Sequence, residues 1–324
     1  MYYNRVLSPE FAKLLENGRE LRWLFDFVKN NNKLDFQIGR NKTKQWISVY
    51  FGLTRLFSIR KFKNSVIFID ADATYKDLLK ELYGRKSITE NFQKEIESLI
   101  VEIENLSQFD RYFKKEKEGY FQNHFSRRYG INSDPDDQFV IIDKEAVIGY
   151  KDQDEKKYIL GNIQKPFKEL QREISILYPK RYGSELEKKS IGNELDFLAL
   201  DNEGNILLIE FKDGSSTSGI YRSPLQIGVY FEIFSKFPIK ELEFTVLEML
   251  AQKQKIGLIN PQWNSPNTIK ALIPVLIISE YNDKSSAKGK FNEILNLIRK
   301  RLGNEFLNNL QTYNYTLNNG LSKW

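Results

Sequence analysis

The chain has 324 residues and a formal net charge of +6, an excess of basic groups that favours a polyanionic partner. It contains no cysteine and one histidine, which excludes disulfides, zinc–thiolate sites and histidine-rich metal sites. The length allows two domains, each with its own core. There is no secretory signal and no apolar run long enough to span a membrane, so we expect a cytoplasmic protein without a membrane partner.

Residues 36–69 form a basic and aromatic stretch without any acidic residue. Basic groups neutralise phosphates and aromatic rings stack on unpaired bases, which predicts a nucleic-acid surface. The residues predicted to contact nucleic acid here are Lys42, Lys44, Arg60, Lys61 and Lys63. An alternative is that residues 46–59 and 65–69 are strands of a structural sheet, with alternate aromatic side chains in the core and solvated lysines outside.

Residues 66–74 hold four apolar residues followed by Asp70 and Asp72. This motif resembles the nucleophile motif of haloacid-dehalogenase-like phosphatases. That family needs a doubly wound α/β domain, whereas the preceding strand-like runs predict hairpins. A strand end followed by an aspartate-rich turn explains the same residues.

Residues 87–129 are charged and have a helical pattern. Their apolar stripe is predicted to be core and consists of Phe92, Ile96, Leu99, Ile100, Ile103 and Leu106. We interpret His124 as a structural helix residue, since no sequence feature gives it a partner. Residues 139–150 predict a small hairpin, and the domain boundary is expected near residues 145–162. We therefore divide the chain into an α+β domain, residues 1–150, and an α/β domain, residues 151–324.

Residues 164–178 predict a helix with Pro166 in its first turn, ended by Pro179. Its glutamates, Glu169 and Glu173, are four residues apart and share one face. They are either a solvated charged face or part of a site.

Residues 194–200 and 206–212 predict two strands joined by a tight turn that contains Gly204. If Leu200 faces Ile206, antiparallel register places Asp196 opposite Glu210. Period-2 alternation also places Lys212 on the same face as Glu210.

Two opposed carboxylates repel each other unless a cation lies between them, and a divalent metal is the simplest candidate. Carboxylate ligands without histidine or cysteine suit Mg²⁺ or Mn²⁺, so Asp196 and Glu210 are the predicted metal ligands. Lys212 is then placed to orient water or to stabilise charge on a phosphodiester. The alternative is that Glu210 and Lys212 form an ordinary ion pair.

Residues 223–234 predict a helix on which Gln226 and Tyr230 project together, one turn apart. Ser223, Pro224 and Gln226 also fit a capping box, a purely structural use of the glutamine. Tyr221 and Arg222 are then expected at the helix entrance, where they could contact phosphate. Residues 271–279 predict a buried strand, with Pro274 indicating an edge or a bulge.

These residues resemble the PD-(D/E)XK nuclease superfamily over roughly residues 163–280, and look most like its Shedu-type and mismatch-endonuclease-type branches. The resemblance implies a restriction-endonuclease-like domain, a mixed sheet flanked by helices, with Asp196, Glu210 and Lys212 as the catalytic set. Glu169 matches the family's helix glutamate. Gln226 with Tyr230 matches the Q-x-x-x-Y pair of RecB-type relatives, which is associated with the DNA and the metal-site acids; the resemblance thus implies a catalytic role for Gln226 and a nucleic-acid contact for Tyr230.

The implied activity is Mg²⁺- or Mn²⁺-dependent endonucleolytic hydrolysis, with DNA as the default substrate, in defence against foreign DNA or in repair. A homo-oligomer is compatible with the sequence. The main alternative is a non-catalytic nucleic-acid-binding or regulatory module of the same fold.

Overall fold

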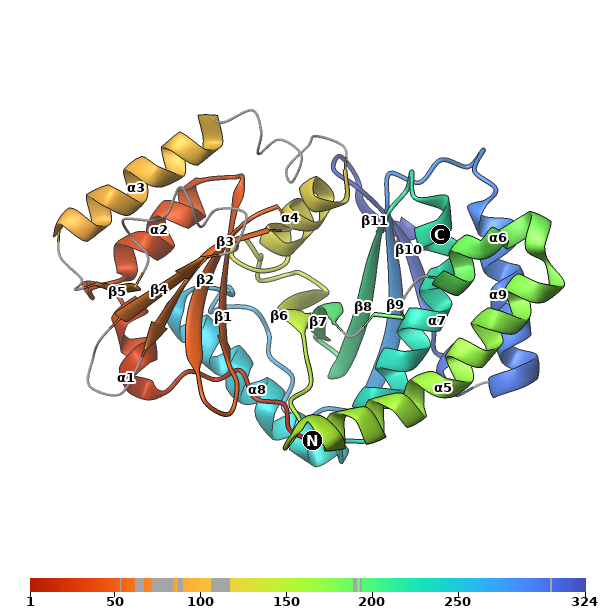
Figure 1. Cartoon of the computed structure of the whole chain (residues 1–324). Helices are drawn as coiled ribbons and strands as arrows, with labels where there is room; N and C mark the ends of the chain where they lie inside the picture. Colours follow the sequence, from red (N-terminus) through yellow and green to blue (C-terminus); the bar gives the residue numbers. More distant parts are fainter. Residues whose placement is uncertain are drawn as a thin grey trace. The chain divides into compact units, whose positions relative to one another are not determined.

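The structure is a computed structural model that describes residues 1–52, 54–61, 67–71, 84–86, 90–105, 117–188, 191–192, 194–303 and 305–324. The chain is a mixed α/β protein that divides into two compact units (Figure 1). Unit 1 consists of residues 1–2, 143–243 and 265–324, and unit 2 of residues 3–142 and 244–264. Residues 244–264, assigned by sequence to the C-terminal domain, therefore cluster with N-terminal residues.

Unit 2 contains a five-stranded antiparallel sheet whose strands follow chain order. The strands are β1 (Leu34–Arg40), β2 (Gln45–Phe51), β3 (Thr54–Lys61), β4 (Ile67–Ala71) and β5 (Gly84–Lys86). The hairpins predicted for residues 36–69 are confirmed. A meander of this kind is not the doubly wound sheet that the phosphatase motif requires.

Four helical segments among the described residues of unit 2 bury an apolar core against one face of this sheet: α1 (Pro9–Ala12), the 3₁₀ turn η1 (Lys13–Leu15), α2 (Arg22–Asn30) and α3 (Glu90–Asn105). Helix α4 (Glu118–Arg128) contacts β1 through Asp35 and Gln37, which alternate with the core residues and therefore face the other side of the sheet. The predicted stripe of α3 is confirmed as core at Phe92, Ile96, Leu99 and Ile100, which cluster with Phe36 of β1. The side chain of Ile103, and Leu106, lie outside the described part of the chain. His124 is half-buried in α4, and burial lowers its pKa.

Residues 244–264 are attached to unit 2 by several polar contacts. They contain most of α8 (Ile239–Ile256). Gln252 accepts a hydrogen bond from the backbone N–H of Leu7 at 2.8 Å and donates to the Leu7 carbonyl at 2.9 Å. Trp263 Nε1 donates to the Asp137 carbonyl at 2.7 Å. Because these are long-range contacts, two separate segments of the sequence build this unit.

The second sheet has six strands in the order β11-β10-β9-β8-β7-β6. They are β6 (Phe139–Ala146), β7 (Leu195–Asp201), β8 (Asn205–Asp213), β9 (Ala271–Ser279), β10 (Gln311–Thr316) and β11 (Gly320–Lys323). Strand β9 pairs parallel with β8 and β10, whereas β7–β8 and β10–β11 are antiparallel, so the sheet is mixed. The hairpin expected for residues 139–150 is wrong, because residues 139–146 form the single strand β6 and Gly149 forms an isolated bridge with Tyr2 instead.

Pro274 lies within β9, which is an interior strand. It pairs with Leu208 of β8, whereas pairing with β10 begins only at Val275. Pro274 therefore occupies a part of β9 with one paired neighbour, which is locally an edge and tolerates the missing N–H.

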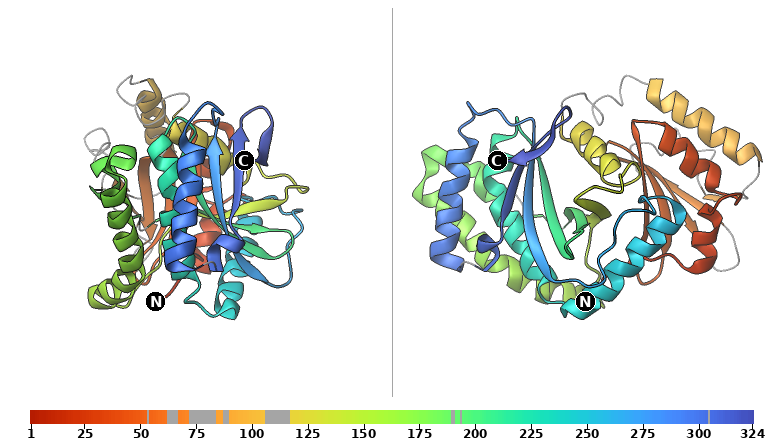
Figure 2. Two further views of the ribbon diagram at one scale, coloured as in Figure 1. Left: turned by 90° about the vertical axis from the view of Figure 1, so that its right-hand side faces the viewer. Right: turned by 180° about the vertical axis from the view of Figure 1, so that it is seen from behind.

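Helices α5 (Gln153–Leu177), α7 (Thr217–Phe234) and α9 (Ala287–Leu302) pack together on one face of the six-stranded sheet (Figure 2). The shorter helices of unit 1 are α6 (Pro179–Lys188) and α10 (Glu305–Asn308). The start predicted for α5 is wrong: the helix begins eleven residues earlier, where Asp152 caps it by accepting from the N–H of Glu155 at 2.8 Å. Pro166 is consequently inside the helix. Among the described residues, no helix is both long and apolar enough to cross a membrane.

Candidate active site

The β7–β8 hairpin has the register expected from the sequence. Leu200 pairs with Ile206, and the paired residues continue to Phe197 and Ile209. Gly204 has φ of 93°, which confirms its role in the turn. The Asp201 carboxylate closes the turn by accepting from the backbone N–H of Asn205 at 2.7 Å.

Asp196, Glu210 and Lys212 converge beyond the last pair of this hairpin. Lys212 Nζ lies 2.5 Å from Glu210 Oε1 and 3.9 Å from Asp196 Oδ2. The same Asp196 oxygen accepts a hydrogen bond from the backbone N–H of Phe211 at 2.8 Å. The hairpin therefore brings together the three residues that the sequence singled out.

The burial of the three side chains is graded. Glu210 is 2% exposed, Lys212 12% and Asp196 23%. One ammonium cannot balance two carboxylates, so the three groups together carry a charge of −1. Because Lys212 is closest to the buried Glu210, the second formal negative charge lies on the more accessible Asp196. This excess would attract a further cation.

The first turn of helix α7 packs against Lys212 of this group. A Cβ atom at Gly219, in the first turn of α7, would lie 3.3 Å from Lys212 Cδ and 2.6 Å from Ser216 Oγ, so the close approach depends on glycine. Tyr230 is buried and donates its hydroxyl to the Glu194 carbonyl at 2.6 Å. Burial, and then the charges of Glu210 and Asp196, raise the pKa of Tyr230. Its hydroxyl therefore stays protonated beside the carboxylates.

Gln226 and Tyr230 approach the same point of the chain. A Cβ atom at Gly192 would collide with the Tyr230 hydroxyl and lie 3.4 Å from Gln226 Nε2. The expectation that the two side chains project together is therefore confirmed, and Gly192 permits the close packing.

The beginning of α7 corrects two expectations. Because α7 starts at Thr217, Ser223 and Pro224 are internal to the helix and do not form a capping box. The Ser223 hydroxyl instead donates to the Ile220 carbonyl at 2.7 Å. Tyr221 and Arg222 lie in the second turn and not at the entrance. Tyr221 is also buried, with its ring centre 5.2 Å from that of Tyr182, so it is not presented to an external phosphate.

Helix α5 approaches the site through a residue that the sequence did not indicate. Gln164 Nε2 donates to the carbonyl of Ile191 at 3.3 Å, next to Gly192, and Lys168 Nζ donates to Gln164 Oε1 at 2.8 Å. Glu169 is exposed and, within the described residues, makes no hydrogen bond or ion pair. A signal for Gln164 was available, because it shares the buried face of the helix with Phe167, three residues later.

The nucleic-acid contacts predicted in unit 2 are spread over its sheet. Lys42 and Lys44 are exposed in the β1–β2 turn, and Lys61 is half-buried at the end of β3. Arg60 forms an ion pair with Asp70 across β3 and β4. Lys63 and Asp72 lie outside the described residues. The aromatic residues Phe51 and Phe57 belong to the core and cannot stack on bases.

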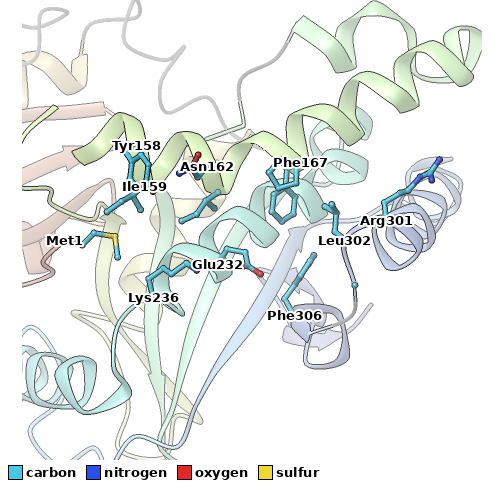
Figure 3. A pocket seen from close by; sticks show the side chains of 13 residues that line it. Met1, Tyr158, Ile159, Asn162, Phe167, Glu232, Lys236, Arg301, Leu302 and Phe306 are labelled. Atoms are coloured by element: carbon cyan, nitrogen blue, oxygen red, sulfur yellow. The ribbon is translucent and has the colours of Figure 1, made fainter. Parts of the chain in front are cut away.

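A cavity of about 870 Å³ lies elsewhere in unit 1, between α5, α7, residues 301–303 and Phe306 (Figure 3). Its lining is mainly apolar, including Ile163, Phe167 and Phe306, with Glu232 contributed by α7 and Lys236 by the residues that follow it. Asp196, Glu210 and Lys212 are not among its lining residues. The cavity is therefore separate from the acidic group.

Whether the site can bind a metal depends on how many protein ligands it offers. No cluster of three or more histidine, aspartate or glutamate side chains suited to a metal ion occurs within the described residues. Mg²⁺ commonly takes only one or two protein carboxylates and keeps water in its other positions. Asp196 and Glu210, with their charge excess, fit that donor set.

Comparison with known proteins found no matching family model, no similar curated protein and no similar solved structure.

Proposed function

We propose that this protein is a metal-dependent endonuclease that hydrolyses phosphodiester bonds of nucleic acid, with DNA as the default substrate. The observation that carries the proposal is the convergence of two carboxylates and one lysine at the end of a hairpin, with a net negative charge. An ordinary structural ion pair has no need of the second carboxylate, which weakens the hairpin through repulsion.

The order of elements supports the same proposal. A helix, the acid-bearing strand β7, the Glu-x-Lys strand β8, helix α7 and the parallel strand β9 follow one another as in the restriction-endonuclease-like pattern that the sequence resembles. A role in defence against foreign DNA or in repair follows only from that resemblance.

In this proposal Asp196 and Glu210 hold Mg²⁺ or Mn²⁺. When bound, such an ion polarises the phosphodiester and lowers the pKa of bound water. The Lys212 ammonium orients the attacking water and stabilises negative charge that develops on the phosphoryl oxygens. The protonated Tyr230 hydroxyl holds the Glu194 backbone next to Asp196, and Gln226 packs beside it.

Helix α5 contributes by positioning the backbone beside the site. Gln164 holds the Ile191 carbonyl, and the adjacent Gly192 contacts Gln226 and Tyr230. Glu169 is the residue of α5 that the family pattern selects, but its exposed position favours a smaller contribution than that of Gln164.

The direct test is a cleavage assay with labelled duplex DNA, single-stranded DNA and RNA, each with Mg²⁺, Mn²⁺ or EDTA. We expect cleavage that needs the metal and is lost in Asp196→Asn. The matched control is Glu203→Gln, which removes an exposed carboxylate from the turn of the same hairpin. Binding without cleavage by the wild-type protein would instead support the non-catalytic module.

A further inference from the structure

A lysine surface flanks the proposed active site on the side of β9 and β10. We define it as Lys284, Lys288, Lys290 and Lys323, of which all but Lys290 are exposed. In the part of the chain that the structure describes, none of the four forms an ion pair. The nearby acids are Glu280, Asp283 and Glu293. Because Glu293 is paired with Arg181, the four lysines and the other two acids leave an excess of +2.

Aromatic rings lie among these lysines. Lys288 Nζ is 5.1 Å from the ring centre of Trp324, and Lys323 Nζ is 4.8 Å from that of Tyr313. Tyr281 packs edge-on against Trp324, with ring centres 5.1 Å apart. Figure 2 shows the end of the chain beside the first turns of α9 in its right-hand view. Cation–π contacts thus keep exposed ammonium groups next to aromatic rings.

The fourth lysine lies on a different face of α9, toward α7, because it is two residues after Lys288. Lys290 Nζ lies 5.4 Å from the ring centre of Tyr221 and 5.9 Å from that of Tyr182, and it donates to the Arg181 carbonyl at 3.1 Å. The neighbouring Glu293 is bonded to Arg181 and to the Tyr182 hydroxyl, so its charge is already compensated.

The segment that carries Lys284 begins directly beside the catalytic strand. Lys212 pairs with Ile278 of β9, and the next residue, Ser279, donates its hydroxyl to the Lys212 carbonyl at 3.3 Å. Further along, the hydroxyl groups of Ser285 and Thr217 lie 3.4 Å apart. Thr217 begins α7, whose first turn covers Lys212. The segment that carries Lys284 therefore runs from the site toward the lysine surface.

We propose that the lysine surface binds the phosphate backbone of the nucleic-acid strand that enters the site, an inference that rests on the proposed function. The acidic group alone would repel a polyanion, so an adjacent cationic surface is needed to hold it. The neighbouring rings favour nucleic acid over an acidic protein, because they can stack on bases.

The test measures binding of a labelled DNA oligonucleotide to the full chain in EDTA, where cleavage does not interfere, over a range of salt concentrations. The variant carries Lys284→Glu, Lys288→Glu and Lys323→Glu. The matched control carries Lys151→Glu, Lys157→Glu and Lys165→Glu, three exposed lysines on or next to α5 that change the net charge equally.

We expect the first variant to bind at least about tenfold more weakly and to lose about three units of salt-dependence slope, one for each phosphate contact. The control should retain wild-type affinity within about twofold and keep the slope. Equal losses in both variants, or a wild-type slope in the first, would overturn the proposal. So would binding of poly-glutamate that depends equally on the three lysines.

The two proposals fail in different ways. Lysine-dependent binding without cleavage in Mg²⁺ or Mn²⁺ would reject the nuclease function and keep the phosphate surface. Metal-dependent cleavage with unchanged binding in the triple variant would do the reverse.

Discussion

Both units bury a carboxylate and a lysine against a sheet, but with opposite consequences. In unit 2, Asp35 is 1% exposed and Lys253 4%. The Asp35 carboxylate accepts from the hydroxyl of Ser126 in α4 at 2.6 Å and from Gln37 Nε2 at 3.2 Å. Lys253 of α8 donates to Gln37 Oε1 at 3.4 Å. The polar groups bind one another and connect two helices to the sheet.

The group in unit 1 differs in charge and in access. It has two carboxylates for one lysine, and it lies at the end of a hairpin with Asp196 partly exposed. Burial of polar groups therefore does not by itself identify a site. An accessible group whose charges do not balance is better suited to bind a cation and a substrate.

The largest expected effect separates the two groups by activity. Asp196→Asn and Glu210→Gln should each lower single-turnover cleavage by about 10³-fold, because each removes a charge that acts at the reacting phosphate. Asp35→Asn should leave the rate of the folded protein within about threefold, since its contacts are internal to unit 2. Equal losses in all three variants would remove the distinction.

The second comparison uses stability. Asp35→Ala should lower the free energy of unfolding in urea by about 3 kcal/mol, because the Ser126 and Gln37 donors lose their acceptor. Asp196→Asn should change it by less than about 1 kcal/mol, since the amide oxygen can still accept from the Phe211 N–H. A larger loss for Asp196→Asn would make its role structural.

Replacement of Lys212 should show the effect of the negative charge of Glu210 and Asp196 on stability. Lys212→Met leaves Glu210 buried without its ammonium and should cost about 3 kcal/mol of stability. Mn²⁺ should restore more stability to this variant than to the wild type, because the metal replaces the missing cation, whereas turnover should stay low. The measurement is the melting temperature with and without Mn²⁺. If Mn²⁺ raised the melting temperature of both proteins equally, the metal would not occupy the place of the Lys212 ammonium.

Tyr230 predicts a pH dependence at the alkaline end. Its raised pKa means that, above about pH 10, the unfolded chain loses this proton while the folded protein keeps it. The stabilising contribution of Tyr230, fully present below that pH, should therefore fall by up to about 1.4 kcal/mol per pH unit. Tyr230→Phe should remove this slope and cost about 1 kcal/mol at neutral pH.

Urea unfolding between pH 8 and 11.5 would measure the effect of Tyr230. Tyr158→Phe is the matched control, because Tyr158 is 72% exposed and should leave the slope unchanged. The assignment fails if the two variants show the same alkaline slope.

The smallest expected difference lies within α5. Gln164→Ala should lower turnover by about tenfold, by releasing the Ile191 carbonyl beside Gly192. Glu169→Ala should change it by less than about twofold, because the side chain is exposed and unbonded among the described residues. The reverse order of effects would restore Glu169 to the site.

The local sequence pattern alone predicted the β7–β8 hairpin and that Asp196, Glu210 and Lys212 lie together at its end. Alternation with period two, together with Gly204, determines which side chains share a face, and a slip of one residue would expose Leu198 and Leu208. The core position of the stripe from Phe92 to Ile100 could also be predicted from the sequence, since a surface helix buries one apolar face. These features depend on residues close together in sequence.

Tertiary packing decided where helices α5 and α7 begin, which unit residues 244–264 join and which residue of α5 contacts the site. Pro166 and Pro224 signal helix starts locally, yet both lie within helices that pack against neighbours and tolerate the lost hydrogen bond. Residues 244–264 join unit 2 through partners such as Leu7 and Asp137, more than a hundred residues away. Gln164 becomes relevant only through its contact with Ile191. No periodicity encodes such contacts, because their free energy depends on groups that only the folded chain brings together.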